Sequence, residues 1–168
     1  RDIAPEHLRQ LVTVIHQNTF IFNDTIRFNI CLGEDFSDEA LERALTLSGV
    51  DRFLPSISGG LDGSCGENGS HLSGGQRQAL TLLMATMQRP HLLLLDEHTA
   101  ALDPATAKKV LDISDSIIRE NGLTALMITH NMKDAINHGT RLIMMNEGHI
   151  ILDVEGEEKK KLTKQQLM

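Results

Sequence analysis

Alternating apolar and polar blocks divide the chain into short strands and amphipathic helices. The apolar runs Leu11–Ile15 and Leu92–Leu95 are too short for helices and predict buried strands. Thr124–Thr129 has the same character and predicts a third buried strand. After Gly75, apolar residues at helical spacing predict a core-facing stripe, made by Leu80, Leu83, Met84 and Met87. Strands that alternate with helices in this way predict an α/β fold with a mostly parallel sheet.

Capping and helix-breaking residues mark where the helices begin and end. Ser37 is placed to cap a helix with an acidic first turn, which the helix dipole favours. Pro104 suits the first position of another helix, which Asn121 and Gly122 end. The Gly- and Ser-rich stretch 55–70 predicts a loop.

Beyond the third strand, the pattern predicts smaller elements. Apolar residues between 132 and 136 indicate a short helix. The runs 142–145 and 150–154 flank a polar, Gly-containing turn, which is typical of a β-hairpin. From Glu155 onward the chain is highly charged, and we expect a solvated helix or a frayed end.

Two adjacent carboxylates follow the second predicted strand. In parallel sheets, ligands bind at the carboxyl ends of strands, where Asp96, Glu97 and, after the third strand, His130 all lie. Asp96 suits Mg²⁺, directly or through water, and Glu97 suits the activation of a water that attacks a phosphate. The alternative is that the two acids only cap the next helix.

The segment Ser73-Gly74-Gly75 opens a predicted helix and is suited to hold an anion. Its glycines let the backbone approach a phosphate closely, and the helix start supplies N–H groups and a positive dipole end. Ser73 and Gln76 also have the spacing of a capping box. Both interpretations can hold together, because the cap is what aims the N–H groups.

Isolated polar residues carry weaker signals. Gln17 by itself is typical of polar surface after a strand. A lone histidine at a strand end is more often structural, but the position of His130 downstream of Asp96-Glu97 favours a hydrogen bond to a γ-phosphate. The remaining histidines show no metal-ligand spacing, so we interpret them as surface or core polar residues: His7, His16, His71, His91, His98, His138 and His149.

The composition of the chain argues against several classes of protein and of site. The net charge of −7 argues against a general nucleic-acid binder. Cys31 and Cys65 lack CxxC spacing, so we expect neither a disulfide framework nor a zinc site, which fits a reducing cytosol. No apolar run is long enough to span a bilayer, and no signal peptide opens the chain. The first residue is Arg1 rather than Met, which suggests a processed or truncated start.

Taken in order, these segments resemble the ATP-binding subunits of ABC transporters. Gln17 matches the Q-loop, Ser73–Gln76 the signature motif, and Leu92–Glu97 the Walker B motif. Ala100–Asp103 matches the D-loop, with Ala where Ser is commoner, and Ile128–His130 matches the switch-histidine loop. The resemblance covers nearly the whole chain.

The resemblance implies a P-loop NTPase-like ABC ATPase domain with a mostly parallel sheet and a helical signature subdomain. Residues of about 18–88 would form the helical subdomain, and residues 1–17 and 89–168 parts of the ATPase core and tail. It implies ATP and Mg²⁺, a second such domain packed head to tail, and a transmembrane permease that holds the domain at the cytoplasmic face of the membrane. Glu97 and His130 would be catalytic, Asp96 and Gln17 would hold the metal, and the nucleotide would contact Gln17, Ser73, Gly74, Gly75, Gln76 and Asp103.

One departure from the family is the phosphate loop. No Gly-x-x-x-x-Gly-Lys-Ser/Thr sequence occurs in the 168 residues. We therefore expect the N-terminal part of the domain, with a central strand, to be missing. That loss predicts exposed apolar surface. It also predicts that the 168 residues alone neither bind ATP tightly nor hydrolyse it.

Alternatives within and beyond transport stay open. Thr25–Ile30 and Gly66–Gly69 are similar to exporters, whereas Leu82–Leu162 is more similar to stand-alone ATPase subunits of uptake systems. A soluble ABC ATPase of DNA repair would need a long coiled coil, and residues 17–73 contain no sustained heptads. A ribosome-associated ABC protein is a further class. A degenerate dimerisation or regulatory domain is the non-enzymatic alternative.

Overall fold

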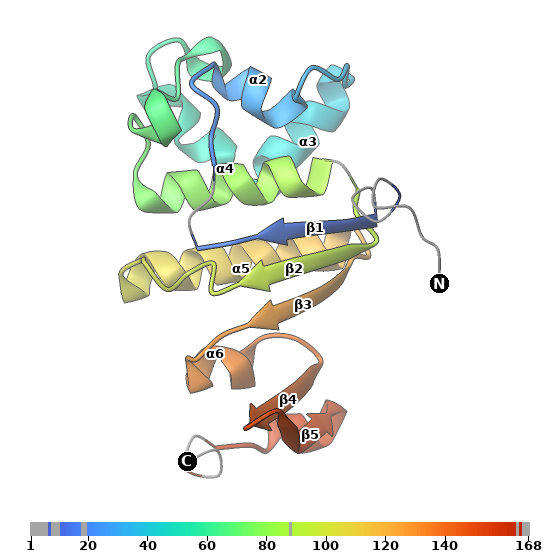
Figure 1. The fold of residues 1–168 in the computed structure, drawn as a ribbon. Helices are drawn as coiled ribbons and strands as arrows, with labels where there is room; N and C mark the ends of the chain where they lie inside the picture. The colour runs from blue at the N-terminus through green and yellow to red at the C-terminus, as the bar shows by residue number, and fades with distance from the viewer. Residues whose placement is uncertain (1–6, 8–10, 18–19, 88, 164, 166–168) are drawn as a thin grey trace. The chain divides into compact units, whose positions relative to one another are not determined.

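The computed structural model describes residues 7, 11–17, 20–87, 89–163 and 165 (Figure 1). By their internal contacts, the residues form two compact units, Arg1–Leu126 and Met127–Met168. Within the described ranges, every helix is too short or too polar to cross a membrane.

The first unit contains the parallel strand pair that the sequence predicted. Strand β1 (Val12–Ile15) pairs in parallel with β2 (Leu92–Asp96), with Ile15 opposite Leu95. Strand β3 (Thr124–Ile128), where the first unit ends and the second begins, completes a sheet in the order β1-β2-β3. The α/β class and the parallel pairing are therefore confirmed.

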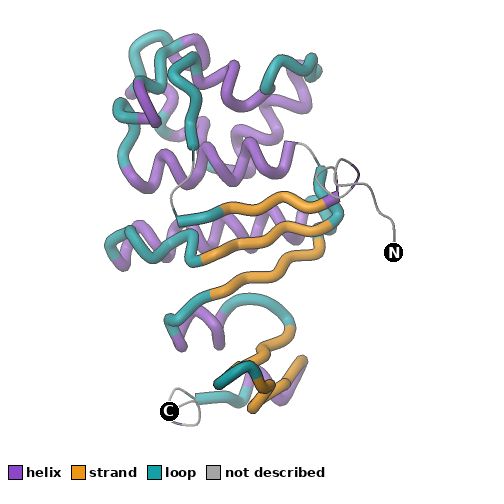
Figure 2. The backbone as a smooth tube through the Cα atoms, viewed as in Figure 1, coloured by secondary structure: helices purple, strands orange, loops and turns teal. Residues whose placement is uncertain are grey.

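Helices form layers beside this sheet. Helix α4 (Gly74–Met87) packs against β1, and α5 (Pro104–Glu120) packs against α4. Helices α2 (Ile26–Cys31) and α3 (Asp38–Ser48) lie on the side of α4 away from the sheet, as Figures 1 and 2 show. The order of these layers buries α4, and Leu80, Leu82 and Leu83 are almost fully buried.

A hydrophobic cluster lies wholly between Ile21 and Met87. It includes the predicted stripe of α4, with Leu80 and Leu83 buried and Met84 and Met87 packed against them. Short 3₁₀ helices occupy parts of the predicted loop and of the residues before it; they span Val50–Arg52, Leu54–Ser56, Gly60–Asp62 and Glu67–Gly69.

Capping residues set the helix ends as predicted. Ser37 Oγ accepts from Ala40 N at 3.2 Å at the start of α3. Pro104 is the first residue of α5, and Asn121 follows its last turn. Helix α2 was not predicted from periodicity, because it is only six residues long. Its sequence signal was the cap Thr25, whose Oγ1 accepts from Phe28 N at 3.0 Å.

The prediction of fully buried strands is wrong for β3 and for part of β1. Leu126 and Ile128 are 52% and 54% exposed, and Val14 is 43% exposed. A parallel strand is buried only where other layers cover both faces of the sheet. In the part of the chain that the structure describes, these three residues are covered only in part. Exposed apolar surface, as the sequence led us to expect, is thus present.

The second unit contains the predicted short helix and hairpin. Helix α6 spans Met132–Asn137, and β4 (Arg141–Asn146) pairs antiparallel with β5 (His149–Glu155). Glu147 and Gly148 at the turn both have positive φ, at 48° and 78°, as the favoured two-residue hairpin turns require. Helix α7 (Gly156–Lys160) follows. The prediction of a solvated tail is wrong for Lys159, which is buried.

Candidate nucleotide site

The ends of β1 and β2 bring several predicted residues to one sheet edge. Because Ile15 pairs with Leu95, His16 and Asp96 leave the sheet side by side. His16 Nδ1 lies 3.3 Å from Asp96 Oδ2, and Gln17 follows, exposed, on the same edge. Sequence reasoning had left His16 among the surface or core histidines. Only the register of the two strands reveals it as a neighbour of the candidate metal ligand.

Glu97 has an unusual backbone conformation. Its φ is +47°, in the left-handed region that residues other than Gly, Asn and Asp seldom adopt. Its carbonyl accepts from Ala100 N at 2.9 Å, so the chain turns sharply after β2. Backbone strain of this kind costs about 1–3 kcal/mol and concentrates at functional sites. Glu97 is held at this cost directly beside Asp96.

The next residue, His98, is a core residue. It is buried, and its Nε2 lies 3.2 Å from Ser114 Oγ in α5. Ser114 Oγ donates its only proton to Val110 O at 2.8 Å, so His98 Nε2 must carry the proton in the bond between them. The core interpretation of this histidine is confirmed. Its bond to α5 also anchors the residue that follows Glu97.

The signature segment opens α4 with the capping box that its sequence predicted. Ser73 Oγ accepts from Gln76 N at 3.3 Å, and Gln76 Oε1 accepts from Ser73 N at 2.8 Å. The side chain of Gln76 is therefore used within the cap. The N–H groups of Gly74 and Gly75 lie outside this exchange, in the first turn, where helices bind anions.

Asp103 caps the neighbouring helix α5. Its Oδ1 accepts from Ala105 N and Thr106 N, both at 3.1 Å. A hydrogen bond from the Thr106 side chain, together with these backbone N–H groups, lowers the pKa of Asp103. Its support of the helix is therefore present above the ordinary carboxyl pKa and is lost as pH falls through the lowered value. A nucleotide contact by Asp103 stays a prediction.

The starts of α4 and α5 approach each other at the two signature glycines. A Cβ on Gly75 would lie 2.5 Å from Thr106 Cγ2, and one on Gly74 would lie 3.0 Å from Leu102 Cδ2. The first distance is shorter than real Cβ contacts allow. Gly75 is thus needed for close packing as well as for any approach of a phosphate.

We expect Gly75→Ala to destabilise the protein by about 1–3 kcal/mol, as overpacking does. Thr106→Ser removes the methyl group that the new Cβ meets, so it should restore most of the loss in the double variant. Urea unfolding followed by circular dichroism measures both effects. Gly74→Ala is the matched control, because the flexible tip of Leu102 can move aside. Equal losses from the two alanines would contradict this account.

A buried side chain connects α4 to the Q-loop residue. Gln78 Nε2 donates to the backbone carbonyl of Gln17 at 3.2 Å. Gln78 lies on the buried side of α4, two residues beyond Gln76. The sequence signal for this contact was a glutamine within a predicted core-facing helix, and our sequence analysis did not use it. The signature helix and the Gln17 loop are therefore in direct contact.

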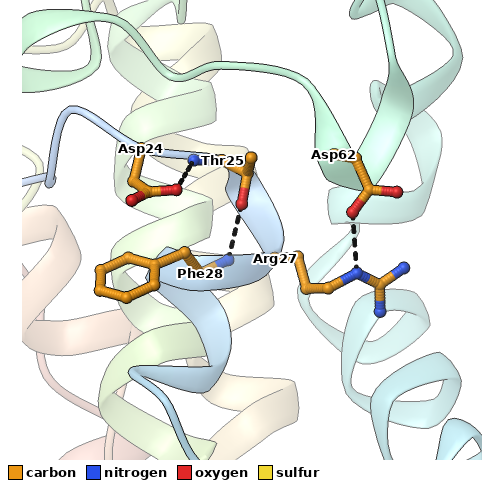
Figure 3. A network of polar contacts seen from close by, with 5 residues as sticks. All are labelled: Asp24, Thr25, Arg27, Phe28 and Asp62. Carbon is orange, nitrogen blue, oxygen red and sulfur yellow. Dashed lines mark hydrogen bonds and ion pairs between the residues drawn. The ribbon is translucent and has the colours of Figure 1, made fainter.

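The residues from Phe22 to Asn29 are fixed by polar contacts around α2. Asp24 Oδ1 accepts from Thr25 N at 2.6 Å, and Arg27 Nε donates to Asp62 Oδ1 at 3.0 Å (Figure 3). Deeper, the fully buried Asn29 accepts from Phe22 N at 2.8 Å and donates to the carbonyls of Phe22 and Thr25. Sequence analysis did not identify this asparagine.

His130 belongs to the second unit, where it lies, exposed, on a capped turn. Thr129 Oγ1 accepts from Asn131 N at 3.1 Å, and Asn131 Oδ1 accepts from Lys133 N at 3.0 Å. These bonds fix the backbone on both sides of His130 and begin α6. That His130 shares an edge with Asp96 stays a prediction.

The donor set at the edge of β1 and β2 fits a magnesium ion that is bound together with phosphates. Mg²⁺ keeps several waters and takes one or two protein carboxylates. Asp96, with a side chain that is 47% exposed, can supply one, and Gln17 offers an amide oxygen. Within the described ranges, no three His, Cys, Asp or Glu side chains gather to hold a metal.

Known proteins with similar sequences are transport proteins. The chain is 51% identical over 98 residues to the tyrosine transport ATP-binding protein of Clostridioides difficile (strain R20291), a match over 58% of this chain and 39% of that protein. It is 32% identical over 163 residues to the ATP-dependent lipid A-core flippase of Desulfotalea psychrophila (strain LSv54 / DSM 12343), over 96% of this chain and 28% of the flippase. The chain thus spans well under half the length of either relative.

A solved structure and a family model agree with these matches. The structure of a bacterial Atm1-family ABC exporter with ATP bound superposes with a TM-score of 0.74 and 27% identity, over 89% of this chain and 26% of the exporter. The family model described as ABC transporter matches residues 1–100. The chain therefore belongs to the ABC transporter family and corresponds to part of its nucleotide-binding domain.

Proposed function

We propose that this chain is part of an ATP-hydrolysing subunit that drives a solute across a membrane. The observation that carries the proposal is the end of the β1–β2 pair, where Asp96 lies beside His16 and Gln17 is the next residue along the chain. Glu97, the residue after Asp96, is held in a strained left-handed conformation at the same end. A carboxylate for a metal and a second carboxylate for a water are the groups that phosphoryl transfer to water needs.

In this proposal, each residue has one task in hydrolysis. Glu97 accepts a hydrogen bond from the attacking water and so orients it toward the γ-phosphate. His130 donates a hydrogen bond to the γ-phosphate, whose negative charge must be stabilised. Asp96 and Gln17 hold Mg²⁺, which when bound neutralises phosphate charge.

The signature segment acts on the nucleotide of a partner. We propose that two nucleotide-binding domains pack head to tail, as the family resemblance implies. Ser73 and the amides of Gly74 and Gly75 then face the ATP held by the Walker residues of the other copy. A transmembrane permease is the second partner, and the domain pair lies at the cytoplasmic face of the membrane.

The phosphate loop is the part of the site that these residues do not supply. Without its backbone N–H groups and lysine, the α and β phosphates have no cradle. We therefore propose that the 168 residues by themselves do not hydrolyse ATP. Tests of activity accordingly use the protein expressed from its complete gene.

Mixed dimers test both the activity and the head-to-tail arrangement. Glu97→Gln removes the water-orienting carboxylate. Ser73→Asp keeps a good helix cap but places a negative charge where a phosphate would bind. If Ser73 acts on the partner's nucleotide, a dimer of one Glu97→Gln copy and one Ser73→Asp copy has one site with both defects and one intact site. We therefore expect this dimer to keep about half of the ATPase rate if its sites turn over independently.

The reciprocal dimer is the control. A copy that carries both substitutions, paired with an unchanged copy, has one defect in each site and should be inactive. An inactive first dimer together with a half-active second dimer would overturn the head-to-tail arrangement. If the unchanged dimer shows no Mg²⁺-dependent ATP hydrolysis, the proposed function itself fails.

A further inference from the structure

The charged tail places a buried cation at the end of α6. Lys159 in α7 is only 4% exposed. Its ammonium donates to three backbone carbonyls, at 2.7 Å to Ile136, 2.6 Å to His138 and 3.0 Å to Gly139. A lysine has three N–H donors, so these three bonds use all of them.

The carbonyls that Lys159 contacts belong to the C-terminal end of α6. Helix α6 ends at Asn137 and is followed by His138. The last carbonyls of a helix have no partners within it and carry the negative end of its dipole. A buried charge is tolerated only where it is paired or fully hydrogen-bonded, which is the case here. Lys159 thus closes a helix end that would otherwise expose carbonyls.

Helix α6 depends on such support. It has six residues, none of them buried, and isolated helices of this length are unstable in water. Its N-terminal end begins at Asn131, directly after His130, and is fixed by the Asn131 cap. Both helix ends are therefore held by side chains, one next to His130 and the other by Lys159. All of these residues lie in the second unit.

We propose that Lys159 is a positioning residue that holds the turn carrying His130 by closing the far end of α6. The ammonium keeps α6 folded, and the folded helix keeps Asn131 and its neighbour His130 in a fixed conformation. The inference rests on the proposed function only in its effect on ATP hydrolysis. The restraint of the helix and of the turn is a property of the chain itself.

The test compares Lys159→Met with Lys160→Met. Methionine keeps an unbranched side chain of similar length but removes every donor. Lys160 is exposed and pairs with Glu157 at 2.6 Å, so it is a neighbouring control outside the carbonyl cluster. We expect the α6 amides of Ala135 and His138 to exchange hydrogen at least about tenfold faster in Lys159→Met and unchanged in Lys160→Met. Hairpin amides in β4 and β5 should keep their protection.

Activity supplies the second readout, measured in the protein from its complete gene. We expect kcat to fall about tenfold in Lys159→Met with little change in KM for ATP, because a misplaced His130 weakens contacts made in the transition state. Unchanged exchange in α6 would overturn the proposal. Faster exchange with an unchanged kcat would overturn the role in positioning His130.

Two further outcomes are distinguishable. If the unchanged protein does not hydrolyse ATP, the proposed function fails. The role of Lys159 can still be decided in that case, from the hydrogen-exchange rates of α6 and from the NMR signals of the His130 ring. If Lys159→Met does not fold, Lys159→Gln keeps two N–H donors and should show faster exchange confined to α6. If amide exchange in that variant became faster to the same extent throughout the second unit, the proposal would be overturned.

Discussion

Replacing Glu97 by glutamine should reduce ATP hydrolysis by the protein from its complete gene by about 10²-fold or more, while ATP still binds. Glutamine has nearly the same shape as glutamate but cannot accept a proton from the attacking water. The loss should appear in kcat and not in the affinity for ATP, because the water is activated only in the transition state. Steady-state hydrolysis and equilibrium nucleotide binding measure the two quantities.

The hairpin of the second unit offers a closely matched control. Glu147 has the same left-handed backbone conformation as Glu97, with φ of 48° against 47°. Glu147→Gln therefore imposes the same change of charge at the same kind of backbone position, away from the candidate site residues in sequence. It should leave hydrolysis unchanged. A similar loss in both variants, or an active Glu97→Gln protein, would remove Glu97 from the mechanism.

Replacing Asn29 by aspartate should cost about 3 kcal/mol or more of stability at neutral pH. Asn29 is fully buried, and its Nδ2 donates to Phe22 O at 3.1 Å and to Thr25 O at 2.9 Å. Aspartate has no N–H group, so a carboxylate oxygen would face two carbonyl oxygens without water. A loss of about 3 kcal/mol is a large part of the total stability of a typical domain. The midpoint of urea unfolding measures the loss.

The loss in Asn29→Asp should depend on pH. Burial and the facing carbonyls would raise the pKa of the new carboxyl above its unfolded value of about 3.9. The variant is therefore most stable below the unfolded pKa, where the carboxyl is neutral, and loses stability as pH rises through the raised, folded value. The difference in unfolding free energy between Asn29→Asp and the unchanged protein should therefore become smaller as pH falls from 7 to 4.

Asn23→Asp is the control for this prediction. Asn23 is exposed and lies one residue beyond Phe22, so the same chemical change there leaves the charge in water. We expect a change in stability within about 0.5 kcal/mol. Equal unfolding midpoints for the two aspartate variants would show that the bonds from Asn29 to Phe22 and Thr25 do not stabilise the fold.

Much of the fold followed from local sequence signals. The paired strands β1 and β2, the caps Ser37 and Asn121, and the hairpin depend on periodicity and on residues that favour particular backbone angles. Those signals act over a few residues and can be recognised without the tertiary structure. Two of the wrong predictions, the burial of β3 and of Val14, concern what covers a strand, which no local pattern reports.

For the candidate site, too, the sequence indicated the residue types, whereas the structure was needed to show the contacts between them. The pair Asp96-Glu97 and the segment Ser73–Gln76 were predicted from sequence as candidates, because their residue types and spacing are typical of phosphate chemistry. The sequence did not reveal that the side chain of Gln76 is used in the cap, or that Thr106 fits against Gly75. Such contacts join residues that are far apart in the chain or depend on a rotamer.

By itself, the sequence determined the α/β class, the order of the motifs and the residue types available for chemistry, because these depend on local periodicity and spacing. The tertiary structure alone decided which side chains meet. It placed His16 beside Asp96 through the strand register, Gln78 against Gln17, and the ammonium of Lys159 at the end of α6. Those contacts follow from how strands and helices pack in three dimensions, and no spacing along the chain encodes them.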